Sequence, residues 1–161
     1  MRRREFIKIF SGAAAVLLPT AVSAQQSNGK RRIGVLLAFE KSDPRPQAWL
    51  NTFTKELAKS GWTAERNLQL EIRWAGNDVG LMQKFASELA ALKPDVILSF
   101  GTPVTAALQR ETRTVPIVFA IVSDPVGEGF VASLAHPGGN ITGFHNSEGT
   151  IGGKWFEFLA Q

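Results

Sequence analysis

The sequence predicts an α/β fold with an open parallel sheet and helices on both of its faces. Strand-like and helix-like segments alternate from residue 32 onward, and the connections between them are short. Residues 32–39 and 116–122 are almost continuous apolar runs, which are typical of strands buried on both faces of a sheet. The strand order expected for this pattern is the flavodoxin-like order 2-1-3-4-5.

The first strand, residues 32–39, is followed by a helix and a second strand. We expect the helix from Pro46 to about Ser60, because apolar side chains recur there at helical spacing and Gly61 follows. Residues 68–74 alternate between polar and apolar side chains, which predicts a half-buried strand at an edge of the sheet.

The middle of the chain repeats the same alternation. Asp78 is expected to cap a helix with an apolar stripe that stops before Pro94. Residues 95–100 form the expected third strand. A helix then runs to about residue 113, with Thr102 as its N-cap and Pro103 at its first position.

After the fourth strand, residues 116–122, the pattern becomes shorter and richer in glycine. We expect a short helix around residues 128–135, a turn at residues 136–140 and a fifth strand at residues 141–144. A further helix is expected to begin at residues 152–155.

Ligands of such sheets bind beyond the carboxyl ends of the strands, which selects residues 38–41, 99–103 and 123–125. Gly101 allows the backbone to approach a ligand closely. The helix that follows presents unpaired N–H groups and a partial positive charge, which suit a carboxylate or a phosphate. The hydroxyl groups of Ser99 and Thr102 are expected to add hydrogen bonds.

Each of these residues also has a purely structural interpretation. Thr102 either contacts a ligand or serves only as a helix cap. Asp124 either receives a ligand amine or caps the turn at Pro125. Phe39 either stacks on a ligand or belongs to the core. The four tryptophans, Trp49 among them, are interpreted as packing residues.

Composition excludes several classes of function. The chain has 18 basic and 14 acidic residues, but four of the basic and one of the acidic lie in residues 1–24, so the remainder carries a net charge of only +1. This balance does not favour nucleic acid as a partner. No cysteine is present, so disulfides and thiolate metal sites are excluded.

Patterns that indicate catalysis are also missing. His136 and His145 lie in turn-like segments rather than on one helix face, which argues against a metal site. The segment around Lys154 lacks the spacing of a phosphate-binding loop, and no nucleophile elbow occurs. We therefore expect a binding protein rather than an enzyme, with no catalytic residues, no metal and no cofactor.

The pattern of residues 1–24 predicts an export signal, and residues 25–31 are expected to form a linker. The pair Arg3-Arg4 precedes an apolar run and the small-residue stretch Val22-Ser23-Ala24. The arginine pair favours the twin-arginine route over an ordinary secretory signal, which is the alternative. The apolar run is shorter than the ~20 residues needed to span a bilayer. We therefore expect a periplasmic protein.

Several segments occur together and in a fixed order: residues 32–39, Gly61-Trp62, Arg66-Asn67, residues 93–98, Gly101-Thr102-Pro103, residues 115–119, residues 123–127, residues 136–143 and Gly152-Gly153-Lys154-Trp155. With the export signal, this set resembles the periplasmic substrate-binding proteins of ABC transporters, in the tryptophan-binding-like family. The resemblance covers residues 32–161 and implies one lobe of a two-lobed type 1 periplasmic-binding fold.

What the resemblance implies is a small solute held between two lobes and delivered to an ABC permease in the inner membrane. It implies a carboxylate at Gly101 and Thr102, an amine at Asp124, and Phe39 in the wall of the pocket. Because such proteins are about twice as long, residues 32–161 are expected to supply the N-terminal lobe and to bind ligand weakly alone. A periplasmic sensor domain, or a secreted α/β enzyme, are the alternatives.

Overall fold

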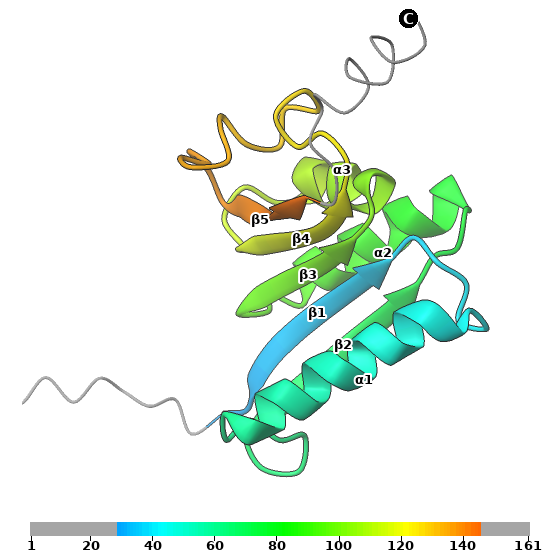
Figure 1. The fold of residues 1–161 in the computed structure, drawn as a ribbon, viewed down its shortest axis with the longest axis vertical. Helices are drawn as coiled ribbons and strands as arrows, with labels where there is room; N and C mark the ends of the chain where they lie inside the picture. The colour runs from blue at the N-terminus through cyan, green and yellow to red at the C-terminus, as the bar shows by residue number, and fades with distance from the viewer. Residues whose placement is uncertain (1–28, 146–161) are drawn as a thin grey trace, which may run out of the picture.

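The computed structural model describes residues 29–145, which form a five-stranded parallel sheet with the order β2-β1-β3-β4-β5 (Figure 1). Every neighbouring pair of strands is parallel. The elements of the described part of the chain are β1 (Arg31–Leu37), α1 (Pro44–Lys59), β2 (Leu68–Trp74), α2 (Val79–Ala91), β3 (Val96–Phe100), α3 (Thr102–Glu111), β4 (Ile117–Val122) and β5 (Ile141–His145). The predicted class and strand order are confirmed.

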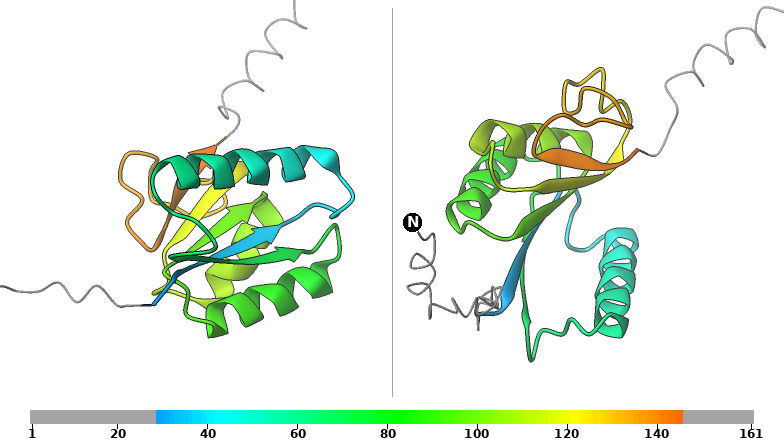
Figure 2. Two further views of the ribbon diagram at one scale, coloured as in Figure 1. Left: turned by 90° about the horizontal axis from the view of Figure 1, so that it is seen from below. Right: turned by 90° about the vertical axis from the view of Figure 1, so that its left-hand side faces the viewer.

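Helices cover both faces of the sheet, as expected. Helix α1 lies on one face, and α2 and α3 lie together on the other (Figure 2). The larger core cluster fills the space beneath α2 and α3, where Leu89, Leu108 and Phe119 are fully or almost fully buried. The smaller cluster joins β1 and β3 to α1 through Leu37, Leu50 and their neighbours.

Two aspartates begin the first two helices. The Asp43 carboxylate accepts a hydrogen bond from the Arg45 N–H (3.0 Å), and α1 begins at Pro44, two residues before the predicted Pro46. The Asp78 carboxylate accepts one from the Leu81 N–H (2.9 Å), so the predicted cap of α2 is confirmed. Each carboxylate satisfies an N–H group that has no partner within the helix.

The amino ends of β1 and β3 are joined by Asp95. Its carboxylate accepts a hydrogen bond from the Arg32 N–H (2.8 Å) and forms an ion pair with the guanidinium of Arg31 (2.6 Å). These two interactions, the backbone hydrogen bond first, lower the pKa of Asp95 below its ordinary value. The carboxylate therefore favours the folded state only while it is ionised.

The helix predicted around residues 128–135 is wrong, because turns occupy this part of the chain. The Gly129 N–H donates to the Val126 carbonyl (3.0 Å), and the Phe130 N–H donates to the Pro125 carbonyl (2.9 Å). Gly129 has a φ angle of +71°, which ends any helical path. The export signal and the helix predicted at residues 152–155 lie outside the described residues.

Within residues 29–145, none of the helices combines the length and apolar character that a membrane crossing requires.

Candidate functional site

The three segments selected from the sequence meet at one edge of the sheet. Leu37 pairs with Phe100, and Phe100 pairs with Ala120, so β1, β3 and β4 end side by side (Figure 1). Beyond these pairs the Ala38 N–H donates to the Phe100 carbonyl (3.1 Å), and the Gly101 N–H donates to the Ala120 carbonyl (3.0 Å). The carboxyl edge therefore carries the loops that follow three neighbouring strands.

Gly101 forms the turn between β3 and α3 and occupies the N-cap position of the helix. Its φ and ψ angles of 110° and 150° lie in a region that is essentially restricted to glycine. A side chain at this position would also bring its Cβ atom to 3.1 Å from the Cβ atom of Ala38. Backbone conformation and close packing both require glycine here.

The predicted N-cap at Thr102 is wrong by one residue, because α3 begins at Thr102 and no side chain caps it. The first helical hydrogen bond runs from the Thr105 N–H to the Gly101 carbonyl (3.2 Å). Pro103 has no N–H group, which leaves the N–H groups of Thr102 and Val104 without an acceptor inside the helix. These two donors and the Thr102 hydroxyl suit a carboxylate.

Ser99 lies below this turn and not at the edge. The side chain is fully buried, and its oxygen lies 2.8 Å from the hydroxyl oxygen of Thr105. Because the Thr105 hydroxyl donates to the Gly101 carbonyl (2.9 Å), the Ser99 hydroxyl donates to Thr105. The predicted direct contact of Ser99 with a ligand does not fit this geometry, in which the two hydroxyls support the Gly101 turn.

An aromatic cluster of Phe39, Trp49 and Phe100 stands beside the Gly101 turn, on the α1 face. The rings of Phe39 and Trp49 meet edge to face at 5.6 Å between centroids. The rings of Trp49 and Phe100 lie nearly parallel at 6.2 Å. Trp49 is nevertheless 37% exposed, so part of its indole surface remains open. The cluster offers an apolar wall for a flat, ring-containing molecule.

Trp49 was not predicted as a site residue, because its helical spacing indicates packing. The signal that could have found it is its position in the first turns of a helix that begins next to the carboxyl edge. A helix that follows a parallel strand starts at the edge where that strand ends, so its early residues lie close to a ligand bound there.

Asp124 is exposed and follows β4. One carboxylate oxygen accepts a hydrogen bond from the Gly127 N–H (2.8 Å), so the capping role weighed from the sequence is present. The structure shows no hydrogen bond to the other oxygen of Asp124 within residues 29–145, and this oxygen can still accept one from an ammonium group. The two interpretations of Asp124 are therefore compatible.

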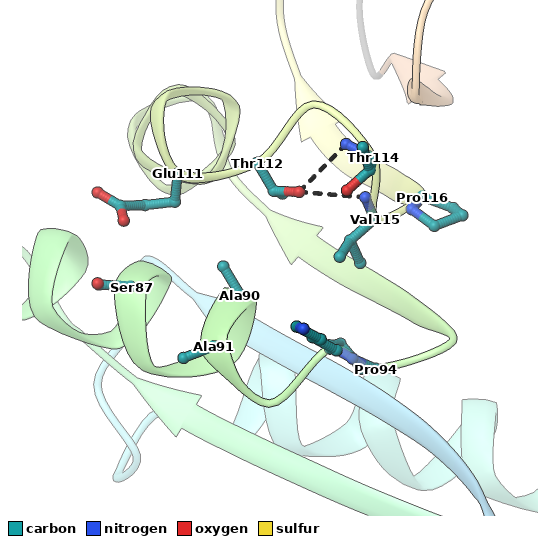
Figure 3. A pocket seen from close by; sticks show the side chains of 10 residues that line it. Ser87, Ala90, Ala91, Pro94, Glu111, Thr112, Thr114, Val115 and Pro116 are labelled. Atoms are coloured by element: carbon teal, nitrogen blue, oxygen red, sulfur yellow. Dashed lines mark hydrogen bonds between the residues drawn. The ribbon is translucent and has the colours of Figure 1, made fainter.

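A cavity of about 530 Å³ lies at the opposite edge of the sheet, between the ends of α2 and α3 (Figure 3). Its wall includes Pro94 and Thr112. The Thr112 hydroxyl accepts hydrogen bonds from the N–H groups of Thr114 (3.2 Å) and Val115 (3.1 Å). This cavity is wide open to solvent and lies at the amino ends of the strands, where sheets of this order do not bind ligands.

The chain is similar to proteins of known function. Residues 35–151 match the family described as ABC transporter substrate binding protein. A tyrosine-binding protein of Clostridioides difficile (strain R20291) is 36% identical over 91 residues, which are 56% of this chain and 26% of that protein.

Solved structures agree with this match. A ligand-free, open substrate-binding protein with adhesive properties from Clostridium difficile has a TM-score of 0.69 and 31% identity, over 80% of this chain and 43% of that chain. A domain from Streptococcus pneumonia in complex with L-Trp has a TM-score of 0.66 and 26% identity, over 73% of this chain and 39% of that chain. The chain thus spans less than half the length of these relatives.

The family match covers more than half of the chain, and the described fold corresponds to one lobe of the solved relatives. The family match also agrees with the prediction of a binding protein rather than an enzyme. This chain belongs to the ABC transporter substrate-binding protein family.

Proposed function

We propose that this chain supplies the N-terminal lobe of the substrate-binding component of an ABC importer, and that the lobe holds an aromatic amino acid at its carboxyl edge. The observation that carries the proposal is the aromatic cluster, in which Trp49 faces Phe100 directly beside the uncapped end of α3. The aromatic wall and the proposed carboxylate site are neighbours, because Phe100 ends β3 and Gly101 follows it directly at the start of α3.

The ring of the ligand is assigned to the aromatic cluster. Offset-stacked and edge-to-face pairs of aromatic rings are worth about 0.5–1.5 kcal/mol beyond the burial of their area. One relative is named for tyrosine binding, and the structure of another contains L-Trp. Both observations support an aromatic side chain over an aliphatic one for this chain.

The charged groups of the ligand are assigned to the two loops that follow β3 and β4. The carboxylate accepts hydrogen bonds from the N–H groups of Thr102 and Val104, where the helix dipole favours negative charge. The ammonium group donates to the carboxylate oxygen of Asp124 that accepts no hydrogen bond within residues 29–145.

We also propose that residues 1–24 direct export to the periplasm and that an ABC permease is the membrane partner. The family match supports the permease, and the arginine pair supports the export route. A second lobe is proposed to close over the edge, because the solved relatives are more than twice as long as the matched part. A lobe alone leaves one side of the ligand in water, so we expect weak binding.

The test is a titration of the uniformly ¹⁵N-labelled chain with L-tyrosine and L-tryptophan, followed through the backbone amide resonances. This measurement detects weak binding. We expect saturable shifts at Gly101, Thr102 and Val104, together with a shift of the Trp49 indole N–H. Tyramine lacks the carboxylate and is expected to leave the α3 amides unshifted, while L-alanine lacks the ring and is expected to leave Trp49 unshifted.

Two results would contradict the proposal. One is the absence of saturable shifts with either aromatic amino acid. The other is a set of shifts confined to the cavity between α2 and α3, around Pro94 and Thr112, which would move the binding site to the opposite edge.

A further inference from the structure

Ile121 adopts a backbone conformation that is costly for its side chain. Its φ angle of +60° lies in the left-handed region, where the branched Cβ atom of isoleucine crowds the backbone. In residues 29–145 the other non-glycine residue with positive φ is Lys93, which is unbranched and lies in the turn after α2. A glycine would adopt either conformation without strain. The presence of isoleucine indicates that its side chain contributes something that glycine cannot.

The strain coincides with a β-bulge. Ala120 pairs with Phe144, and Val122 pairs with His145, so Ile121 is the extra residue of β4 opposite β5. Bulges of this kind redirect side chains and are frequent beside functional sites.

The bulge changes the face on which Ile121 lies. Regular alternation would place Ile121 with Phe119 in the core beneath α2 and α3. Instead, Ala120 and Ile121 both pack against the cluster on the α1 face, and Val122 returns to the core beneath α2 and α3. The extra residue therefore brings a branched apolar side chain to the face that carries the aromatic cluster.

Ile121 also stands at the carboxyl edge itself. The residue before it, Ala120, accepts the hydrogen bond from the Gly101 N–H (3.0 Å), and Phe100 belongs to the same apolar cluster as Ile121. Two residues further on, the chain turns at Ser123 and reaches Asp124. The bulge is thus placed between the proposed ring wall and the proposed ammonium acceptor.

We propose that Ile121 determines specificity: the strained bulge holds its side chain at the edge, where it packs against the ring of an aromatic ligand and sets the position of the Asp124 loop. This inference rests on the proposed function. It adds a residue that selects the ligand side chain by shape.

The test compares Ile121→Gly with Ile121→Val in the same chain by amide titration with L-tyrosine and L-alanine. Glycine relieves the strain and removes the side chain, whereas valine keeps the β-branch. We expect Ile121→Gly to lose affinity for L-tyrosine by about tenfold, as for the removal of a few methylene groups from a pocket. We expect Ile121→Val to stay close to the parent, and affinity for L-alanine to change little in either variant.

Lys93→Gly is the matched control, because it relieves the other positive φ angle at a distance from the carboxyl edge. It is expected to leave the affinity for L-tyrosine unchanged. Thermal unfolding of each variant separates binding from stability. If Ile121→Gly does not fold, Ile121→Asn replaces it, since asparagine tolerates the left-handed region and removes the apolar branches.

A parent chain that binds L-tyrosine together with a folded Ile121→Gly variant that binds it equally well would overturn the inference and leave the proposed function intact. An Ile121→Gly variant that loses stability but keeps its affinity for L-tyrosine would also overturn the inference, since it would show that Ile121 has a packing role alone. A parent chain that binds no aromatic amino acid would overturn the proposed function and this inference with it.

Discussion

The indole ring of Trp49 lies nearly parallel to the phenyl ring of Phe100, with 6.2 Å between the centroids and 9° between the planes. Trp49 belongs to α1 and Phe100 to the last position of β3. The pair therefore connects the helix on one face of the sheet to the edge beside Gly101. Because Trp49 remains 37% exposed, the same ring that packs on Phe100 can also contact a ligand.

Replacement of Trp49 by alanine should weaken the binding of L-tyrosine by about tenfold, which corresponds to ~1.4 kcal/mol and to the loss of one aromatic contact. Trp62→Ala is the matched control, because Trp62 is 38% exposed but follows the far end of α1. Amide titrations of both variants measure the effect. Equal affinities of the two variants would remove Trp49 from the site.

Gly101→Ala should destabilise the lobe by about 1–3 kcal/mol, because alanine is strained at this φ and its Cβ atom would crowd Ala38. The free energy of unfolding, measured in urea, checks this value. Gly139→Ala is the control, since nothing lies within 4 Å of a Cβ atom there. A Gly101→Ala variant as stable as the control would contradict the geometry of the turn.

The hydroxyl pair Ser99–Thr105 predicts non-additive effects on stability. Thr105→Val leaves the buried Ser99 hydroxyl without its acceptor and should cost about 1–3 kcal/mol, while the Gly101 carbonyl keeps the hydrogen bond from the residue 105 N–H. The double variant Ser99→Ala/Thr105→Val removes this unpaired hydroxyl and should recover part of the loss. A double-mutant cycle of unfolding free energies measures the coupling. Strictly additive effects would show that the two hydroxyls do not interact.

Asp95 should make the stability of the fold depend on pH under acidic conditions. Its pKa is lowered in the folded state, chiefly by the hydrogen bond from the Arg32 N–H and next by Arg31. Its contribution is therefore present above the unfolded pKa of about 3.9 and is lost as the pH falls through the lower, folded value. Solvent exposure of the pair keeps the effect small.

Urea unfolding of the parent and of Asp95→Asn, at about pH 7 and about pH 3, tests this dependence. The parent should lose more stability on acidification than the variant does. The same loss in both proteins would show that other carboxylates dominate.

The arginine pair at the start of the chain makes a separate prediction about export. Arg3→Lys/Arg4→Lys keeps the positive charge that a general secretory signal requires but removes the pair that the twin-arginine route requires. Cell fractionation should find the variant retained in the cytoplasm and the parent in the periplasm. Unchanged export of the variant would indicate the general secretory route.

The fold could be predicted from the sequence because each element has a strong local signal. Residues 68–74 alternate cleanly and form β2 with the predicted bounds, at the predicted edge of the sheet. Asp78 caps α2 as predicted. Short connections and apolar strands then leave little choice of topology, so the carboxyl edge could be located without a structure.

Details that depend on packing could not be predicted. A threonine before a proline suggests a cap at Thr102, but Gly101 occupies the N-cap position in a backbone conformation that is essentially restricted to glycine. Periodicity places Trp49 on a helix face without showing that it reaches Phe100. The bulge at Ile121 has no sequence signal, because its apolar neighbours suit a regular strand equally well.

The central claim is that an aromatic amino acid lies with its ring on Trp49 and its carboxylate at the start of α3. Intermolecular nuclear Overhauser effects between L-tyrosine and the labelled chain test this placement directly. We expect contacts from the tyrosine ring protons to the indole protons of Trp49, and contacts from its α-proton to the amides of Thr102 or Val104. Contacts confined to other residues, or none under saturating conditions, would contradict the claim.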